Sequence, residues 1–277
     1  MTRLAAVVLA ALVLAAGAGA SPVTGAAEFL QRSQRGDGGF AEPGSSPDVS
    51  LTAWAALGLE AAGAPAGRAA GFLVEHAEEA ESATDLALAL LAGAALEADV
   101  GALAERVLAL ARPDGRIGPT VNSTIWCVLA LRQAGAAVPA GSARYLLGVQ
   151  SRSGGWSWAR GVAADSNDTA AAIQALRSLG VGGRPIRRGL VFLRGLQNAD
   201  GGFELTAGRG SDAQSTAWAI QAFLAAGERP GAAAHRYLAR LRRPDGSYRY
   251  SARYAVTPVW VTAQVLPALA RRPFPLP

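Results

Sequence analysis

The sequence predicts an all-α protein made of six helical hairpins. Six apolar segments each open at a threonine, at steps of 32 to 47 residues. A repeat of this length indicates supersecondary units that stack because no unit can bury its apolar face alone. The segments open at Thr52, Thr84, Thr124, Thr169, Thr216 and Thr262.

These six segments are expected to be buried helices. They are rich in Ala and Leu and apolar on nearly every side, as in residues 216–227, TAWAIQAFLAAG. A helix that is apolar all round belongs in an interior. Four of the six end at a glycine suited to a helix C-cap.

An amphipathic segment precedes each buried one. Residues 186–196, for example, place Leu190, Leu193 and Leu196 at helical spacing with Arg on the other face. We therefore expect each hairpin to consist of an outer helix followed by an inner helix.

Five of the hairpins carry the same glycine turn, of which Asp200-Gly201-Gly202-Phe203 is an example. Asp or Ser accepts a backbone hydrogen bond two residues on, Gly allows a positive φ, and the apolar residue tucks under the turn. Only the second hairpin, around residues 75–83, lacks the turn. Gln34, Gln150 and Gln197 precede three of the turns, where an amide could tie the helix end to the loop.

With these turns the chain resembles the prenyltransferase and squalene-oxidase repeat family. The resemblance rests on Phe29-Leu30 through Asp37-Gly38-Gly39-Phe40, Tyr145-Leu146 through Gly154-Gly155-Trp156, and Phe192-Leu193 through the turn at 200–203. The family includes triterpene cyclases, protein prenyltransferase β-subunits and the α-domain of cobalamin carriers. The resemblance covers roughly residues 25–270 and implies an α/α toroid, with six inner helices ringed by six outer ones.

In such a toroid, the loops before the inner helices and the first turns of those helices border a central cavity. Aromatic walls with a few polar groups at one rim suit a large apolar or planar ligand. Packing alone would also explain the tryptophans that recur two residues after a starting threonine. The candidate ligand-binding residues are Asp48, Trp54, Asn122, Trp126, Trp158, Asp165, Asn167, Asp168, Asp212, Gln214, Trp218 and Trp260.

Residues 165–168 read Asp-Ser-Asn-Asp and resemble the Asp-x-Asp-Asp acid of class II terpene cyclases, with Asn167 in the donor position. An Asn amide cannot donate that proton, so Asp165 and Asp168 are the remaining catalytic candidates. Asp48 and Asp212 also lie four residues before their own threonine, so Asp165 could instead cap its helix.

Two other chemistries find less support. The zinc of protein prenyltransferases needs Asp, Cys and His ligands, whereas Cys127 has no Asp two residues before it and His76 and His235 fall on outer segments. We expect no metal and no cofactor. A glycosidase or lyase needs two facing carboxylates, for which Asp168 and Asp212 are a remote option.

The N-terminus is typical of a secretory signal peptide. Arg3 precedes an apolar run, and residues 18–20 read Ala-Gly-Ala, so we expect cleavage after Ala20 and an extracytoplasmic protein. The predicted organisation is a signal peptide at 1–20, a toroid at 21–272 and a disordered tail at 273–277.

Charge supports no nucleic-acid partner. The net charge is +5 and all 26 basic residues are Arg, but no basic strip interleaved with aromatics appears. The Arg-rich late half leaves a membrane or transporter partner open.

Export, a single toroid, a replaced acid and no zinc ligands favour a secreted, non-catalytic binding protein. The ligand expected from the family resemblance is a corrinoid or an isoprenoid lipid. The alternative is a class II terpene cyclase-like enzyme that uses Asp165 or Asp168 as its acid.

Overall fold

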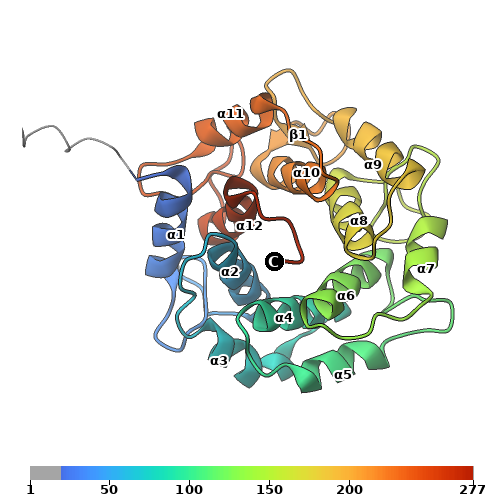
Figure 1. Cartoon of the computed structure of the whole chain (residues 1–277). Helices are drawn as coiled ribbons and strands as arrows, with labels where there is room; N and C mark the ends of the chain where they lie inside the picture. The colour runs from blue at the N-terminus through green and yellow to red at the C-terminus, as the bar shows by residue number, and fades with distance from the viewer. Residues whose placement is uncertain (1–19, 277) are drawn as a thin grey trace, which may run out of the picture.

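The computed structural model describes residues 20–276 and shows an all-α toroid, as predicted. Six inner helices surround the axis and six outer helices surround them, alternating along the chain (Figure 1). The inner helices are α2 (Val49–Ala61), α4 (Ala83–Ala95), α6 (Val121–Gln133), α8 (Ser166–Ser178), α10 (Ala213–Ala225) and α12 (Pro258–Ala270). The outer helices are α1 (Pro22–Ser33), α3 (Ala69–Glu75), α5 (Gly101–Ala109), α7 (Ser142–Gly148), α9 (Arg184–Arg194) and α11 (Ala232–Leu241).

Little other regular structure occurs in the described residues. A short 3-10 helix, Ala77–Glu79, follows α3, and β1 (Phe203–Glu204) pairs antiparallel with β2 (Ser211–Asp212) beside α10. Within residues 20–276, no helix is both long and apolar enough to cross a membrane. The predicted signal peptide falls almost wholly in residues 1–19, outside the described residues.

The glycine turns form as the sequence predicts. The Asp200 Oδ1 atom accepts the Gly202 N–H at 2.9 Å, and Gly201 adopts a φ of 87°. A Cβ on Gly201 would lie 2.6 Å from the Ala233 carbonyl oxygen of α11, so the next hairpin also needs glycine here. The preceding Gln197 donates from Nε2 to the Gly201 carbonyl at 3.0 Å. Gln34 and Gln150 make the same bond in their own turns, so the expected tie is confirmed.

The recurring threonine has a structural role. In five hairpins its hydroxyl accepts the backbone N–H of the apolar residue that ends the glycine turn. The Phe203 N–H to Thr216 Oγ1 bond, at 2.9 Å, is buried and typical. Thr84 belongs to the hairpin without the turn and bonds elsewhere, to Asn122 Oδ1 at 2.9 Å.

Neighbouring hairpins are joined at the starts of the inner helices. One N–H group in the first turn of each of α6, α8 and α10 donates to a carbonyl in the loop of the next hairpin, such as Ala213 N–H to Tyr250 O at 2.7 Å. At α12 the next hairpin is the first one, and there the Glu42 carboxylate accepts Val259 N–H at 3.1 Å and Trp260 N–H at 2.8 Å. A carboxylate at a helix N-terminus is favourable, so Glu42 helps to close the ring.

The expectation of a disordered tail is wrong for residues 273–276. The tail turns back from α12 into the centre of the ring (Figure 1). Phe274 is buried there, its N–H donates to Gln174 Oε1 at 2.8 Å, and the Leu276 N–H donates to Gln133 Oε1 at 2.7 Å. Order follows because the tail buries two apolar side chains and the amides of α8 and α6 satisfy its backbone.

Candidate active site in the central cavity

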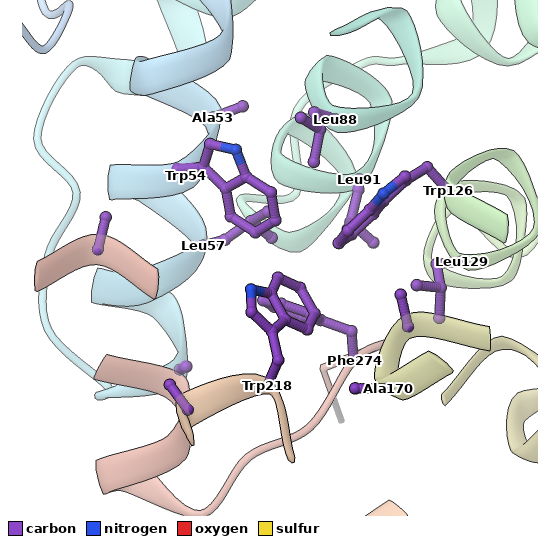
Figure 2. Close-up of a cluster of buried hydrophobic side chains, with 14 of the residues drawn as sticks. Ala53, Trp54, Leu57, Leu88, Leu91, Trp126, Leu129, Ala170, Trp218 and Phe274 are labelled. Atoms are coloured by element: carbon purple, nitrogen blue, oxygen red, sulfur yellow. The ribbon is translucent and has the colours of Figure 1, made fainter. Parts of the chain in front are cut away.

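Three indoles meet on the axis of the toroid. Trp54, Trp126 and Trp218 come from α2, α6 and α10, and their ring centroids lie 5.1 to 5.5 Å apart at edge-to-face angles of 82° to 89° (Figure 2). Aromatic quadrupoles favour this geometry. Phe274 completes the cluster at 6.4 Å from Trp54 and 6.0 Å from Trp218. The three tryptophans therefore pack as core, and they also form part of the cavity wall.

A cavity of about 310 Å³ lies where the inner helices begin. The cavity is lined by ten of the twelve ligand-binding residues predicted from the sequence and by three residues that the sequence reasoning missed. The lining residues are Trp54, Asn122, Trp126, Trp158, Asp165, Asn167, Asp168, Ala171, Leu205, Gln214, Trp218, Trp260 and Gln264.

Two predicted residues lie elsewhere. Asp48 is exposed and borders a separate acidic hollow with Glu78, Glu79 and Glu81. Asp212 is 2% exposed, and its two carboxylate oxygens accept Ser215 N–H and Ser215 Oγ–H at 2.7 and 2.8 Å. Burial raises the pKa of Asp212, and the Ser215 hydrogen bonds oppose that rise.

The capping role suggested for these aspartates is confirmed. Asp48, Asp165 and Asp212 are the N-caps of α2, α8 and α10, each accepting the N–H three residues on. The Asp165 Oδ1 atom accepts Asp168 N–H at 2.8 Å. Asp165 therefore starts α8 and, by doing so, holds Asp168 in the first turn of the helix at the cavity wall.

Asp168 is the carboxyl with the most altered acidity at this site. Its side chain is buried and accepts a hydrogen bond from Asn122 Nδ2 at 2.7 Å. Burial and the nearby Asp165 charge raise the pKa of Asp168 to about 8, although the Asn122 bond opposes the rise. Burial also raises the pKa of Asp165. The environment inside an aromatic cavity therefore favours the protonated form of Asp168.

Asn122 is held in place by its neighbours. Its Oδ1 accepts the Thr84 hydroxyl, and its backbone N–H donates to the Trp158 carbonyl at 3.0 Å. Because Thr84 binds the amide oxygen, the amide nitrogen of Asn122 faces Asp168. Thr84, Asn122 and Asp168 belong to the second, third and fourth hairpins, so three hairpins together position the Asp168 carboxyl group. Trp158 itself is 57% exposed at the cavity mouth.

Zinc ligands do not come together in the described part of the chain, where no group of three or more His, Cys, Asp or Glu side chains could hold a metal. Cys127 is buried in α6, and burial raises the pKa of its thiol to about 12. A thiol in that state is a poor metal ligand and a poor nucleophile.

Of the residues that the sequence reasoning missed, Gln264 and Ala171 had a detectable signal. Both lie two residues after a starting threonine, the register of Trp54, Trp126 and Trp218. That register faces the axis, so each residue in it was a candidate for the wall. Leu205 sits in an irregular loop, where no periodicity predicts its direction.

Comparison with known proteins identifies the fold. No family model matches the chain, and no curated protein matches it. Solved structures do match. The type II terpene cyclase MstE from Scytonema, in complex with geranylgeranyl dihydroxybenzoate, is 16% identical with a TM-score of 0.65, covering 90% of this chain and 96% of the cyclase. The ent-copalyl diphosphate synthase from Streptomyces platensis is 19% identical with a TM-score of 0.59, covering 80% of this chain and 50% of the synthase.

A glycosidase in complex with glucose also matches, at 14% identity and a TM-score of 0.66, covering 90% of this chain and 95% of the glycosidase. The chain thus has the α/α toroid fold of terpenoid cyclases and prenyltransferases. Because one fold hosts several chemistries, function has to be argued from the site.

Proposed function

We propose that this protein is a class II terpene cyclase-like enzyme that acts on a small isoprenoid, with Asp168 as its general acid. The observation that carries the proposal is a buried carboxyl with a pKa raised to about 8 on the wall of an aromatic cavity. This reverses the preference for a non-catalytic protein that the sequence alone suggested. That preference rested on export, the single toroid and the lack of zinc ligands as well as on Asn167, and the adjacent Asp168 offers the acid that Asn167 cannot.

The chemistry needs one proton and a protected cation. One Asp168 oxygen accepts the Asn122 amide, and the nearby Asp165 charge favours a proton on the Asp168 carboxyl. Transfer of that proton to an alkene carbon forms a C–H bond from the π electrons and leaves a carbocation and the Asp168 carboxylate. Indole faces stabilise such cations, and three buried indoles line the cavity. A second alkene of the same substrate then attacks the carbocation, so that its π electrons form the ring C–C bond and the positive charge moves to its other carbon. Loss of a proton from a neighbouring carbon to water ends the reaction as a new alkene, and the Asp168 carboxylate takes up a proton from solvent before the next turnover.

The fold matches cyclases and a glycosidase about equally well, so the residues of the site have to decide between the two chemistries. MstE structures contain a geranylgeranyl substrate and a merosterolic acid product in the same toroid fold. A glycosidase needs two carboxyl groups facing one substrate. Asp212, the second candidate, is fully engaged with Ser215 and does not line the cavity.

The test is product formation from linear isoprenoids. The full chain is incubated with geraniol, farnesol and their terminal epoxides, and products are identified by gas chromatography and mass spectrometry. We expect a cyclic product from the native protein and from Asp48→Asn, a matched helix-cap variant remote from the cavity. Asp168→Asn should form none. Cyclic product that persists in Asp168→Asn, or no product from any substrate, would refute the proposal.

A second candidate is ligand binding without turnover, and Asn167 favours it. Asn167 lines the cavity at the donor position of the cyclase motif, where an amide cannot transfer a proton. Such a carrier would be exported through residues 1–20 and deliver an isoprenoid to a membrane or transporter. Cell fractionation and co-purified lipid would test this. A corrinoid could only lie across the rim, because about 310 Å³ is at the small end of the range for drug-sized ligands, roughly 300–1,000 Å³.

A further inference from the structure

Six residues lie two positions after a starting threonine, and Gln264 is the polar one among them; the other five are Trp54, Leu86, Trp126, Ala171 and Trp218. Gln264 lies on α12, two residues after Thr262, where α2, α6 and α10 place a tryptophan. It lines the central cavity and is only 1% exposed. A buried amide in an apolar wall is costly unless both its oxygen and its NH₂ group have partners.

The direction of this amide is fixed by Trp218. The Trp218 Nε1 atom lies 2.9 Å from Gln264 Oε1. An indole nitrogen is only a donor, so the atom that faces it has to be the amide oxygen. The NH₂ group of Gln264 therefore points away from Trp218.

The NH₂ group has no acceptor. Within the described residues, nothing accepts a hydrogen bond from Gln264 Nε2, although the atom is buried. Because Gln264 lines the cavity, its unsatisfied donor lies beside the cavity wall, where a ligand that brings an acceptor would satisfy it.

The rest of the wall limits the charge of that acceptor. None of the described residues that line this cavity is basic, and two of them, Asp165 and Asp168, are acids. A diphosphate would lose its hydration here without gaining a cation, which is unfavourable. A neutral oxygen suits one amide donor in an aromatic wall.

We propose that Gln264 selects an isoprenoid that carries a neutral oxygen acceptor, such as an alcohol, ketone or epoxide, over a hydrocarbon or a diphosphate. The inference rests on the proposed function for the isoprenoid class of the ligand. The ligand is small. A cavity of about 150 Å³ holds one benzene, so about 310 Å³ holds roughly two rings' worth of carbon.

The experiment compares geraniol, myrcene and geranyl diphosphate, which share one carbon skeleton. Binding to the full chain is followed by quenching of tryptophan fluorescence, because three buried indoles line the site, and by the rise in Tm. The test variant is Gln264→Met. The matched control is Gln221→Met, because Gln221 is an equally buried amide on α10 that does not line the cavity.

We expect the native protein and Gln221→Met to bind geraniol about five- to ten-fold more tightly than myrcene, the value of one neutral hydrogen bond. Gln264→Met should bind geraniol and myrcene with about equal affinity. Its affinity for myrcene should match that of the native protein. Geranyl diphosphate should bind more weakly than geraniol in all three proteins. Equal affinity for geraniol and myrcene in the native protein would overturn the inference, as would an unchanged preference in Gln264→Met.

Failure of this inference is distinguishable from failure of the proposed function, because binding requires no turnover. If Gln264→Met is poorly folded, Asp168→Asn supplies an independent arm. This variant keeps Gln264, so it should lose product formation and keep the preference for geraniol. Loss of the preference in Asp168→Asn would place the selecting donor at Asp168 and refute the role of Gln264.

Discussion

Replacing Asp168 by Asn should stabilise the protein, which is the opposite of the usual effect of a buried substitution. Asn has the same shape, can accept the Asn122 hydrogen bond through its carbonyl oxygen, and carries no charge. The change therefore removes a titration while it keeps the packing.

The magnitude follows from the pKa. The folded chain holds the Asp168 proton up to about pH 8, whereas an unfolded Asp releases it near about pH 3.9. Between these values the unfolded state binds fewer protons, so stability falls as pH rises, by about 1.4 kcal/mol per unit. From about pH 5 to about pH 8 the native protein should lose on the order of 3 to 4 kcal/mol from this group.

Urea unfolding of both proteins at about pH 5 and about pH 8 measures the effect. Asp168→Asn should be more stable than the native protein at both pH values, and its advantage should grow by on the order of 3 to 4 kcal/mol at the higher pH. Asp48→Asn is the control, because Asn caps a helix about as well as Asp and Asp48 is exposed. An advantage that is the same at both pH values would refute the reasoning, since it would mean that Asp168 ionises normally.

Four further predictions test the fold. Phe274→Ala should cost about 3 kcal/mol of unfolding free energy, because it removes the ring that packs on two indoles; a loss below about 0.5 kcal/mol would place the tail outside the ring. Glu42→Ala should cost about 1–3 kcal/mol by leaving two N–H groups of α12 without their acceptor, and Glu42→Gln should recover part of that in the same urea assay. Thr216→Val should cost about 1–3 kcal/mol, since the buried Phe203 N–H loses its partner; an unchanged midpoint would contradict the structural role of the threonine repeat. Cys127, with a thiol pKa of about 12, should react with Ellman's reagent only in denaturant, and rapid reaction in the native protein would show that α6 is exposed.

The repeated features were readable from sequence because each has a local cause. The turn at Asp200 needs a short acceptor and a positive φ, and these leave a recognisable pattern. The Gln197 tie and the Asp165 cap are also bonds across three or four residues. Such short-range contacts recur with the repeat, so six hairpins and their turns could be predicted.

The threonine repeat was visible, but its reason was not. The hydroxyl of Thr169 accepts an N–H from Trp156, 13 residues earlier. The sequence did contain a clue, because Thr84 stands in the one hairpin that lacks the turn and makes no such bond.

The site could be predicted only in outline. Ten lining residues were expected because the inner-helix starts border the axis of any toroid. The separation of Asp165 from Asp212 was not predictable, since both are N-caps four residues before a threonine. Only Asp165 lines the cavity, whereas both carboxylate oxygens of Asp212 are engaged by Ser215. The tail was missed because the Gln174 amide that orders Phe274 lies 100 residues away in sequence.

The account depends most on a protonated Asp168 in the cavity wall, and an NMR titration measures that state directly. Protein labelled with carbon-13 at the Asp carboxyl groups is followed from acid to alkaline pH, and Asp168→Asn assigns the resonance by its disappearance. We predict that this carboxyl titrates near about 8. Titration of Asp168 near about 3.9, the value of an ordinary Asp, would contradict the proposal that it is the proton donor of the site.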